Sequence, residues 1–257
     1  YPDRAAQLRA KPSRPSGADR PNNYIPFPRN PLFQPRPGEF ERLGLVGVVG
    51  MGGIGKTQLA VELAYRYMDR FPSGIFWTPA TGTTVFDWQR QLAELAFNAD
   101  YLLPDDDVSS PENESRRARH FCRYLAQHAG ALLILDNVED PNLVMTALPA
   151  LAGGEVACPI LYTSRITLTP PGTTTHSVEQ LPPEGAHRLL LETTRPQLLL
   201  EVLAGSQDAE AKAARLVCQE VGYLPLALVH LRGLLARDQK VTLIRLAEVL
   251  KQRSVLD

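Results

Sequence analysis

The residues with the clearest chemical potential are those of the stretch GMGGIGKT, from Gly50 to Thr57. It follows an apolar run at 45–49 and opens an amphipathic run at 58–70, so the pattern GxxxxGKT has the strand, loop and helix context of a phosphate-binding loop. Glycines there turn backbone N–H groups toward phosphate oxygens, and the helix N-terminus adds positive potential. Lys56 would neutralise phosphate charge and Thr57 would ligate Mg²⁺. A glycine-rich turn without a ligand is the alternative.

A second candidate is Asp136, which ends the apolar run in ALLILDNVED at 131–140. A carboxylate at the carboxyl end of a buried strand can hold Mg²⁺, directly or through water, opposite Thr57. An aspartate that only starts a turn is the common alternative for such a strand ending. The phosphate-binding loop upstream reverses that preference, so the sequence favours a magnesium-binding role for Asp136.

A third candidate is Arg165, which ends the stretch ILYTSR at 160–165. This is another apolar run, and it presents Thr163 and Ser164 beside the arginine. A guanidinium at the carboxyl edge of a parallel sheet can reach the terminal phosphate of a nucleotide and respond to its presence. A surface ion pair is the alternative interpretation of the same residue.

Apolar runs that alternate with helical periodicity predict the elements that position these residues. Strands are expected at 45–49, 75–78, 131–135, 160–163 and 175–178, with helices between them at 58–70, 85–98, 114–128 and 142–151. The pattern predicts an α/β fold with a parallel, doubly wound, five-stranded sheet flanked by helices. Beyond about residue 181, four amphipathic helices are expected at 185–193, 209–221, 226–237 and 243–252.

The domain organisation follows from these elements and from the N-terminal composition. Residues 1–38 are rich in proline and arginine and predict a linker that forms no regular helix and buries little apolar surface. We expect a nucleotide-binding domain at 39–181 and a small helical domain at 182–257.

The composition of the 257-residue chain is that of an ordinary globular protein, with 44% hydrophobic residues and a net charge of −1. It has no basic excess for nucleic acid, and its apolar stretches are far shorter than the roughly 18 residues that span a bilayer. Because no apolar segment resembles a signal peptide, a cytoplasmic location without membrane contact is expected. The cysteines and histidines lack ligand spacing, so we expect buried reduced thiols rather than disulfides or a metal site.

Four motifs together carry a family resemblance: GMGGIGKTQLA, LLILDNVED, LYTSR and VGYLPLAL at 221–228. Their order and approximate spacing resemble those of the NB-ARC nucleotide switches of the STAND class of signal-transduction ATPases, the NLR-like proteins, and their prokaryotic members in particular. The resemblance covers about residues 33–255. It implies a P-loop NTPase fold with an ARC1-like helical domain, binding of ATP or ADP with Mg²⁺, and self-association on activation in signalling or defence.

The resemblance also implies roles for individual residues. Lys56 and Asp136 would act at the phosphates, Arg165 would serve as a sensor of the terminal phosphate, and the magnesium ligands would be Thr57 and Asp136. Pro225, in GYLPLA, would touch adenine and ribose, and its place also suits the first turn of a helix. The nucleotide-binding set would comprise Gln34, Arg36, Gly50, Met51, Gly52, Gly53, Ile54, Gly55, Lys56, Thr57, Gln58, Pro225 and Leu226.

Two places depart from the pattern of this family. In LFQPRPGEFERL, which looks like a degraded adenine-contacting F-x-GRE segment with Gln34 and Arg36, Pro35 replaces the glycine and Pro37 the glutamate. After Asp136, Asn137 replaces a second aspartate that could act as a general base. Hydrolysis should therefore be slow unless 139–140, a glutamate and an aspartate, orient the water. Effector and sensor domains are expected outside this stretch of chain.

Other functions of a phosphate-binding loop stay open at this point. A working ATPase of the AAA+ type, acting on DNA or protein through sustained turnover, is the main alternative. A small-molecule kinase or a GTPase is a further one, although the chain has no Asn-Lys-x-Asp sequence that would read guanine. The chain also has no LSGGQ segment of a transporter ATPase.

Overall fold

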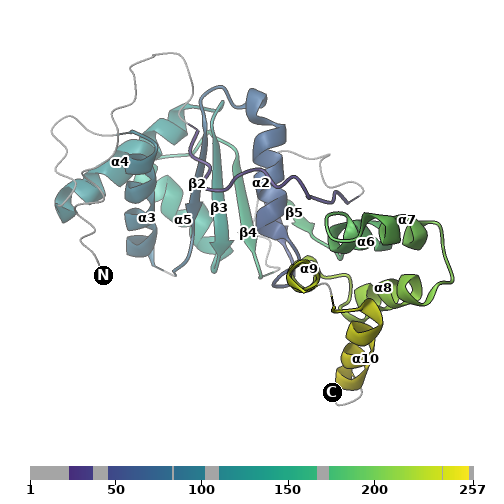
Figure 1. Cartoon of the computed structure of the whole chain (residues 1–257). Coiled ribbons are helices and arrows are strands. Elements are labelled where there is room, and N and C mark those ends of the chain that lie inside the picture. Colours follow the sequence, from purple (N-terminus) through teal and green to yellow (C-terminus); the bar gives the residue numbers. More distant parts are fainter. Residues whose placement is uncertain are drawn as a thin grey trace.

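A single parallel sheet organises the first part of the molecule (Figure 1). The computed structural model describes residues 23–36, 46–82, 84–101, 110–166, 174–238 and 240–254. Within them the strand order is β2-β3-β4-β1-β5, and every pairing is parallel. The strands are β1 (Val46–Val49), β2 (Ile75–Pro79), β3 (Leu132–Val138), β4 (Ile160–Ser164) and β5 (Thr174–Ser177). The predicted five-stranded parallel sheet is confirmed, and the expected strand residue 45 lies outside the described part.

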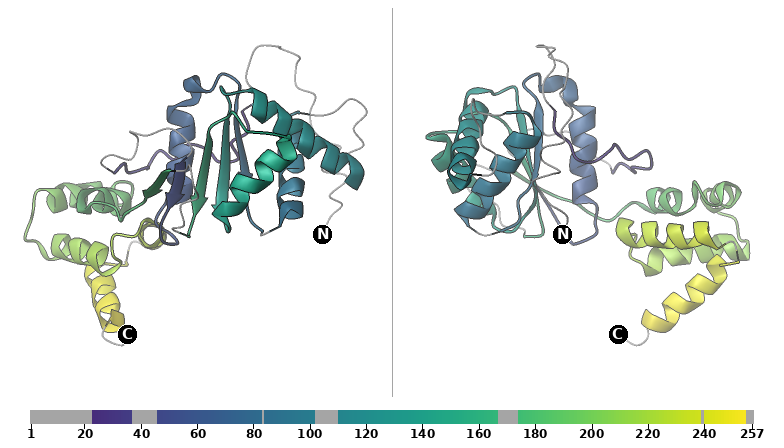
Figure 2. Two further views of the ribbon diagram at one scale, coloured as in Figure 1. Left: turned by 180° about the vertical axis from the view of Figure 1, so that it is seen from behind. Right: turned by 60° about the vertical axis from the view of Figure 1, so that its left-hand side comes forward.

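Helices cover both faces of this sheet, as its apolar strands require. On one face lies α2 (Lys56–Arg66), which ends earlier than expected and is followed by a 3-10 turn at Met68–Arg70. On the other lie α3 (Val85–Asn98), α4 (Pro111–Gln127) and α5 (Pro141–Ala152) (Figure 2). Doubly wound connectivity places the carboxyl ends of all strands at one edge of the sheet.

Side chains of β2 show how the two faces separate. Ile75 and Trp77 belong to the core beneath α2, whereas Phe76 between them belongs to the core beneath α3 and α4. This alternation follows from strand geometry, in which successive side chains point to opposite faces of the sheet. All three side chains are almost fully buried. The central strands therefore consist of continuous apolar runs, which is why the sequence revealed them.

A bundle of five helices follows β5 in the described residues. They are α6 (Pro183–Leu191), α7 (Pro196–Leu203), α8 (Ala209–Glu220), α9 (Pro225–Arg237) and α10 (Leu243–Ser254), and they enclose a core of their own. We call residues 183–254 the helical part. The sequence predicted four of these helices and missed α7. Its segment PQLLLEVL is short, and its run of three leucines hides the helical period.

The N-terminal residues 23–36, which we call the strap, correct the expectation of a linker that buries little surface. Tyr24 forms a parallel bridge with Phe76 at the free edge of β2. From there the strap, which is purple in Figure 1, crosses α2. Its Ile25 and Phe33 pack against the core beneath α2. Backbone hydrogen bonds to the sheet edge order the strap without any helix. The rest of the proposed linker, residues 1–22 and 37–38, lies outside the described part.

Two further expectations can be compared with the described residues. The three cysteines are free and buried, and burial raises the pKa of each thiol to about 12, so the thiols stay neutral and unreactive. The described helices include none with both the length and the apolar character to cross a bilayer.

Gly47 provides a test of the packing between β1 and β4. It is paired with Tyr162, and a methyl group on Gly47 would overlap the Tyr162 ring, which is fully buried. We expect Gly47→Ala to lower the free energy of unfolding by roughly 1–3 kcal/mol, because the ring has no room to retreat in a packed core. Urea denaturation measures this change. Gly154→Ala adds the same methyl group where nothing lies within 4 Å, and an equal loss there would contradict the steric explanation.

Candidate functional site

The loop from Gly50 to Thr57 joins β1 to α2, as the sequence predicted. Two of its glycines, Gly53 and Gly55, have a backbone conformation that residues with a side chain rarely adopt. Gly55 is the N-cap of α2 with a φ of 102°, in the left-handed region that favours glycine. Gly53 has a φ of 77°, and a methyl group on it would lie 3.1 Å from the side chain of Leu226 in α9. The loop can therefore turn its backbone inward while α9 approaches it closely.

Lys56 lies at the first turn of α2 with its side chain folded over the loop. Its Nζ donates to the carbonyl oxygens of Gly50, at 2.8 Å, and of Met51, at 2.9 Å. Burial and, secondarily, the positive charge of Arg165 lower the pKa of Lys56, whereas Asp136 opposes this shift. Because a partly desolvated cation beside another cation is disfavoured, an anion bound here would relieve the repulsion.

Asp136 is held at the carboxyl end of β3 by two hydroxyl groups. Thr57 Oγ1 donates to Asp136 Oδ1 at 2.9 Å, and Thr163 Oγ1 donates to the same oxygen at 2.6 Å. Thr163 also accepts a hydrogen bond from the backbone N–H of Asn137 at 2.8 Å. The pair predicted to hold a divalent cation is thus in direct contact, and hard oxygen ligands of this kind suit Mg²⁺.

Asn137 has a left-handed backbone, with a φ of 61°. The register between β3 and β4 shifts at this point, between Leu135 and Val138. Asparagine tolerates this conformation better than most residues do. The irregularity brings Asn137, Thr163 and Arg165 to one surface at the end of the sheet, where they line the same cavity.

That cavity has a volume of about 590 Å³ and draws on five stretches of the chain. Its described lining comprises Asn30 of the strap, Gly52, Gly53, Gly55, Lys56, Thr57 and Gln58 of the loop, Asn137, Thr163 and Arg165 of the strand ends, and Pro225, Leu226, Val229 and Arg232 of α9. Among these lining residues three are cations and none is acidic. The size is that of a cofactor site, and the charge suits a polyanion.

Helix α9 closes this cavity from the side of the helical part. Pro225 occupies its first turn, and the backbone N–H of Leu226 donates to the carbonyl oxygen of Gly53 at 3.3 Å. Figure 1 shows α9 between the end of the sheet and the other helices. The sequence-predicted Pro225 and Leu226 therefore adjoin the loop, although they lie about 170 residues away in the chain.

A smaller cavity of about 70 Å³ adjoins the first one and contains the predicted adenine-contacting residues. Gln34 and Arg36 line it together with Gly55 and Pro225. Arg36 is only 8% exposed, and its Nη2 donates to the carbonyl oxygen of Ile54 at 2.7 Å. Despite the proline replacements, the strap brings both residues to the loop. Pro37 lies outside the described residues.

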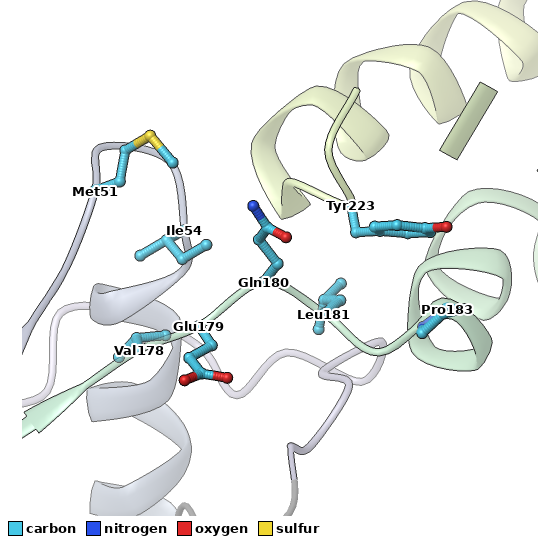
Figure 3. A pocket seen from close by; sticks show the side chains of 8 residues that line it. All are labelled: Met51, Ile54, Val178, Glu179, Gln180, Leu181, Pro183 and Tyr223. Carbon is cyan, nitrogen blue, oxygen red and sulfur yellow. The ribbon is translucent and has the colours of Figure 1, made fainter. Parts of the chain in front are cut away.

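Met51 and Ile54 are the predicted binding residues whose side chains face elsewhere. Both line a third hollow, of about 480 Å³, on the other side of the loop, where β5 leads into α6 (Figure 3). Figure 3 shows Met51 at the tip of the loop, with Tyr223 across the hollow. Ile54 is buried and Met51 exposed. Neither residue is among those that line the cation-lined cavity.

Several residues at the site were not assigned binding roles from the sequence. Thr163 was noticed only as a strand ending, and Asn30, Val229 and Arg232 carry no recognisable motif. The period of α9 could have identified Val229, since it follows Pro225 by four residues. Conversely, Glu139 accepts from the backbone N–H of Gly82, and Asp140 caps α5 through the N–H of Asn142. Neither acid is among the residues that line the cavity.

Comparison with protein families identifies one domain type along this region. The model of the NB-ARC domain matches residues 36–198. This span runs from Arg36 through the sheet and into the helical part, and so includes the loop, Asp136 and Arg165.

Similar proteins are regulators from bacteria and a fungal NLR-like protein. The chain is 27% identical over 221 residues to the regulatory protein AfsR of Streptomyces griseus, covering 84% of this chain and 21% of that protein. AfsR of Streptomyces coelicolor is 26% identical over the same length. A nucleotide-binding leucine-rich repeat (NLR)-like protein of Hyaloscypha variabilis is 29% identical over 136 residues, covering 47% of this chain and 13% of that protein. The chain spans about a fifth of the length of the AfsR relatives.

Solved structures with a related arrangement are more distant in sequence. A STAND protein with a tetratricopeptide repeat sensor from Pyrococcus horikoshii has 19% identity and a TM-score of 0.44, covering 88% of this chain and 33% of that one. A Drosophila ORC structure has 17% identity and a TM-score of 0.48, covering 84% of this chain and 63% of that one.

The attachment of the strap to α2 depends on Glu62, whose side chain is 5% exposed. Its carboxylate accepts from Arg29 Nε at 2.9 Å, from Arg29 Nη2 at 2.8 Å and from Arg66 Nη2 at 3.1 Å. The hydrogen bonds from Arg29 are the main reason that the pKa of Glu62 is lowered. The stabilisation is therefore present above the ordinary pKa of 4.5 and is lost as the pH falls through the lower, folded-state pKa.

We expect Glu62→Gln to lower the free energy of unfolding at pH 7 by about 1 kcal/mol, since Arg29 is half exposed and solvent screens the pair. The gap between wild type and variant should close as the pH falls below the ordinary glutamate pKa. Urea denaturation from pH 7 to pH 3 measures both effects. Glu184→Gln, in the exposed pair with Arg188, is the control and should change little. A gap that stays constant with pH would contradict the assigned role.

Proposed function

This chain belongs to the NB-ARC domain family, and we propose that it is the nucleotide-binding core of a regulatory ATP/ADP switch. The observation that carries the proposal is the convergence of five separate segments on one cation-lined cavity. The loop, the ends of β3 and β4, the strap and α9 all contribute to it. A bound nucleotide would contact the sheet and the helical part at once, so it could bias how they pack.

The residues present fit a magnesium-bound nucleotide. The loop supplies inward backbone N–H groups and Lys56 for phosphate oxygens. Thr57 and Asp136, in contact at 2.9 Å, are the oxygen ligands proposed for Mg²⁺. The ion would neutralise phosphate charge, and Thr163 would hold the Asp136 carboxylate in position for it. Gln34, Arg36 and Pro225 would bind the adenosine end, which the smaller cavity adjoins.

Arg165 is proposed as the residue that distinguishes ATP from ADP. It is exposed at the end of β4 and lines the cavity close enough to Lys56 to lower its pKa. A guanidinium in this place gains a charge-assisted hydrogen bond only when a terminal phosphate is present. Differential affinity of this kind is what allows a ligand to shift a conformational equilibrium.

Slow hydrolysis is part of the proposal. The residue after Asp136 that lines the cavity is Asn137, which cannot accept a proton from water. Because Glu139 and Asp140 are engaged with Gly82 and Asn142, a general base is lacking among the described lining residues. Slow turnover suits a switch, whose bound state must persist, better than a motor.

We also propose that the switch works within a larger signalling protein. The AfsR relatives are about four times as long as this chain, so effector and sensor regions are proposed outside it. The active, ATP-bound form would self-associate, in a signalling or defence role. Exchange of nucleotide would control that assembly through the packing of α9 against the loop.

The first test of the proposal is nucleotide binding itself. Lys56→Ala should weaken binding of ATP with Mg²⁺ by about a hundredfold or more, because it removes a charge-assisted contact worth up to ~3 kcal/mol. Isothermal titration calorimetry measures the affinity. Lys212→Ala removes an equal charge on the exposed face of α8 and should leave binding unchanged. Tight binding of ATP by the Lys56 variant would refute the site.

The second test concerns turnover. Wild-type protein should hydrolyse ATP well below the 1–100 per second that is roughly typical of phosphoryl-transfer enzymes. Asn137→Asp places a carboxylate at the cavity and should raise the single-turnover rate by about tenfold or more, since general-base catalysis contributes roughly 10²–10⁴-fold when well aligned. Glu139→Gln, outside the cavity lining, should not change the rate. Fast turnover by wild type without a partner would favour a working ATPase instead.

A further inference from the structure

Arg232 brings a third positive charge to the large cavity, from the helical part. Pro225, Leu226, Val229 and Arg232 all line this cavity, and their spacing along α9 puts them on one face of the helix. At a rise of about 1.5 Å per residue, Arg232 lies roughly 10 Å along the axis from Pro225. The face that meets the loop at Gly53 thus carries a cation two turns further along.

The surroundings of Arg232 leave its charge without an acidic partner. It is half-buried, and its Nη1 donates to the backbone carbonyl oxygen of Leu189 in α6 at 3.5 Å, a long bond to a neutral acceptor. Across the described ranges, no carboxylate comes within ion-pair distance of Arg232. Lys56 and Arg165 line the same cavity, so an anion bound there would meet positive charge from the loop, from the end of β4 and from α9.

We propose that Arg232 is a phosphate-binding residue, through which the helical part holds the phosphates of a nucleotide bound in the loop. The inference rests on the proposed nucleotide binding and extends it to a residue outside every sequence motif. Guanidinium groups suit phosphate oxygens because their N–H donors match the geometry and the charge persists. A nucleotide would then join α9 to the loop through charge, as well as through the apolar contacts of Pro225 and Leu226.

A purely structural role for Arg232 would make a different prediction. If its only task were to brace α6 through the carbonyl oxygen of Leu189, then glutamine could still donate there and nucleotide affinity would not change. Arg232→Gln therefore separates the charge from the hydrogen bond. Arg237→Gln removes an equal charge from the exposed end of the same helix, outside the cavity lining, and serves as the matched control.

The experiment is calorimetric titration of wild type and both variants with a non-hydrolysable ATP analogue and with adenosine, each with Mg²⁺ at low ionic strength. Arg232→Gln should weaken the affinity for the ATP analogue by about tenfold. Its affinity for adenosine should stay within twofold of wild type. Arg237→Gln should match wild type for both ligands. Raising the salt concentration should reduce the difference in affinity for the analogue between wild type and Arg232→Gln, since salt screens the contact that only wild type makes.

The outcomes separate this inference from the proposed function. If wild type binds neither ligand, the nucleotide switch itself fails. If wild type and Arg232→Gln bind the analogue equally well, Arg232 does not bind phosphate and the nucleotide switch stands. The same conclusion follows if the variant loses affinity for the analogue and for adenosine by the same factor. Thermal melting without ligand should give the same midpoint for wild type and Arg232→Gln, which excludes unfolding as the cause of weaker binding.

Discussion

The close approach of α9 to the phosphate-binding loop is the constraint on which the arrangement of the whole site depends. The backbone N–H of Leu226 reaches the carbonyl oxygen of Gly53, and a side chain on Gly53 would meet Leu226 at 3.1 Å. Only a glycine with a positive φ allows the loop to curl inward and the helix to pack on it. The same glycine thus serves two purposes: it shapes the phosphate cradle and admits the wall that closes it.

The strap adds a second long-range constraint. Its Tyr24 extends the sheet at β2, Arg29 is anchored to the buried Glu62 on α2, and Arg36 donates to Ile54 within the loop. A segment with many prolines and no regular structure is ordered because its first two anchors lie on β2 and α2. The loop is therefore held by two distant segments: the strap contacts it at Ile54, and α9 contacts it at Gly53.

The sequence predicted the sheet, its flanking helices and the main motifs because each has a local signature. Buried parallel strands give continuous apolar runs, and the glycine pattern of the loop is specific. It could not predict Thr163 as the support of Asp136, since that contact depends on the register between β3 and β4. Arg232 stands in no motif, although it follows Pro225 by seven residues and so lies on the same face of α9 as Val229. The strap was misjudged because composition reports the lack of helix but does not report pairing with a sheet edge.

The distribution of charge links the proposed switch to its energetics. Three cations line the cavity, while the nearest acid, Asp136, is already hydrogen-bonded to two threonines. Two of the cations belong to the sheet and its loop, and the third belongs to α9. A bound polyanion would attract the cations on both sides of the contact between α9 and the loop. In the proposed switch, the free energy of nucleotide binding would therefore act directly on the contact between the two parts, and the number of phosphates would set its size.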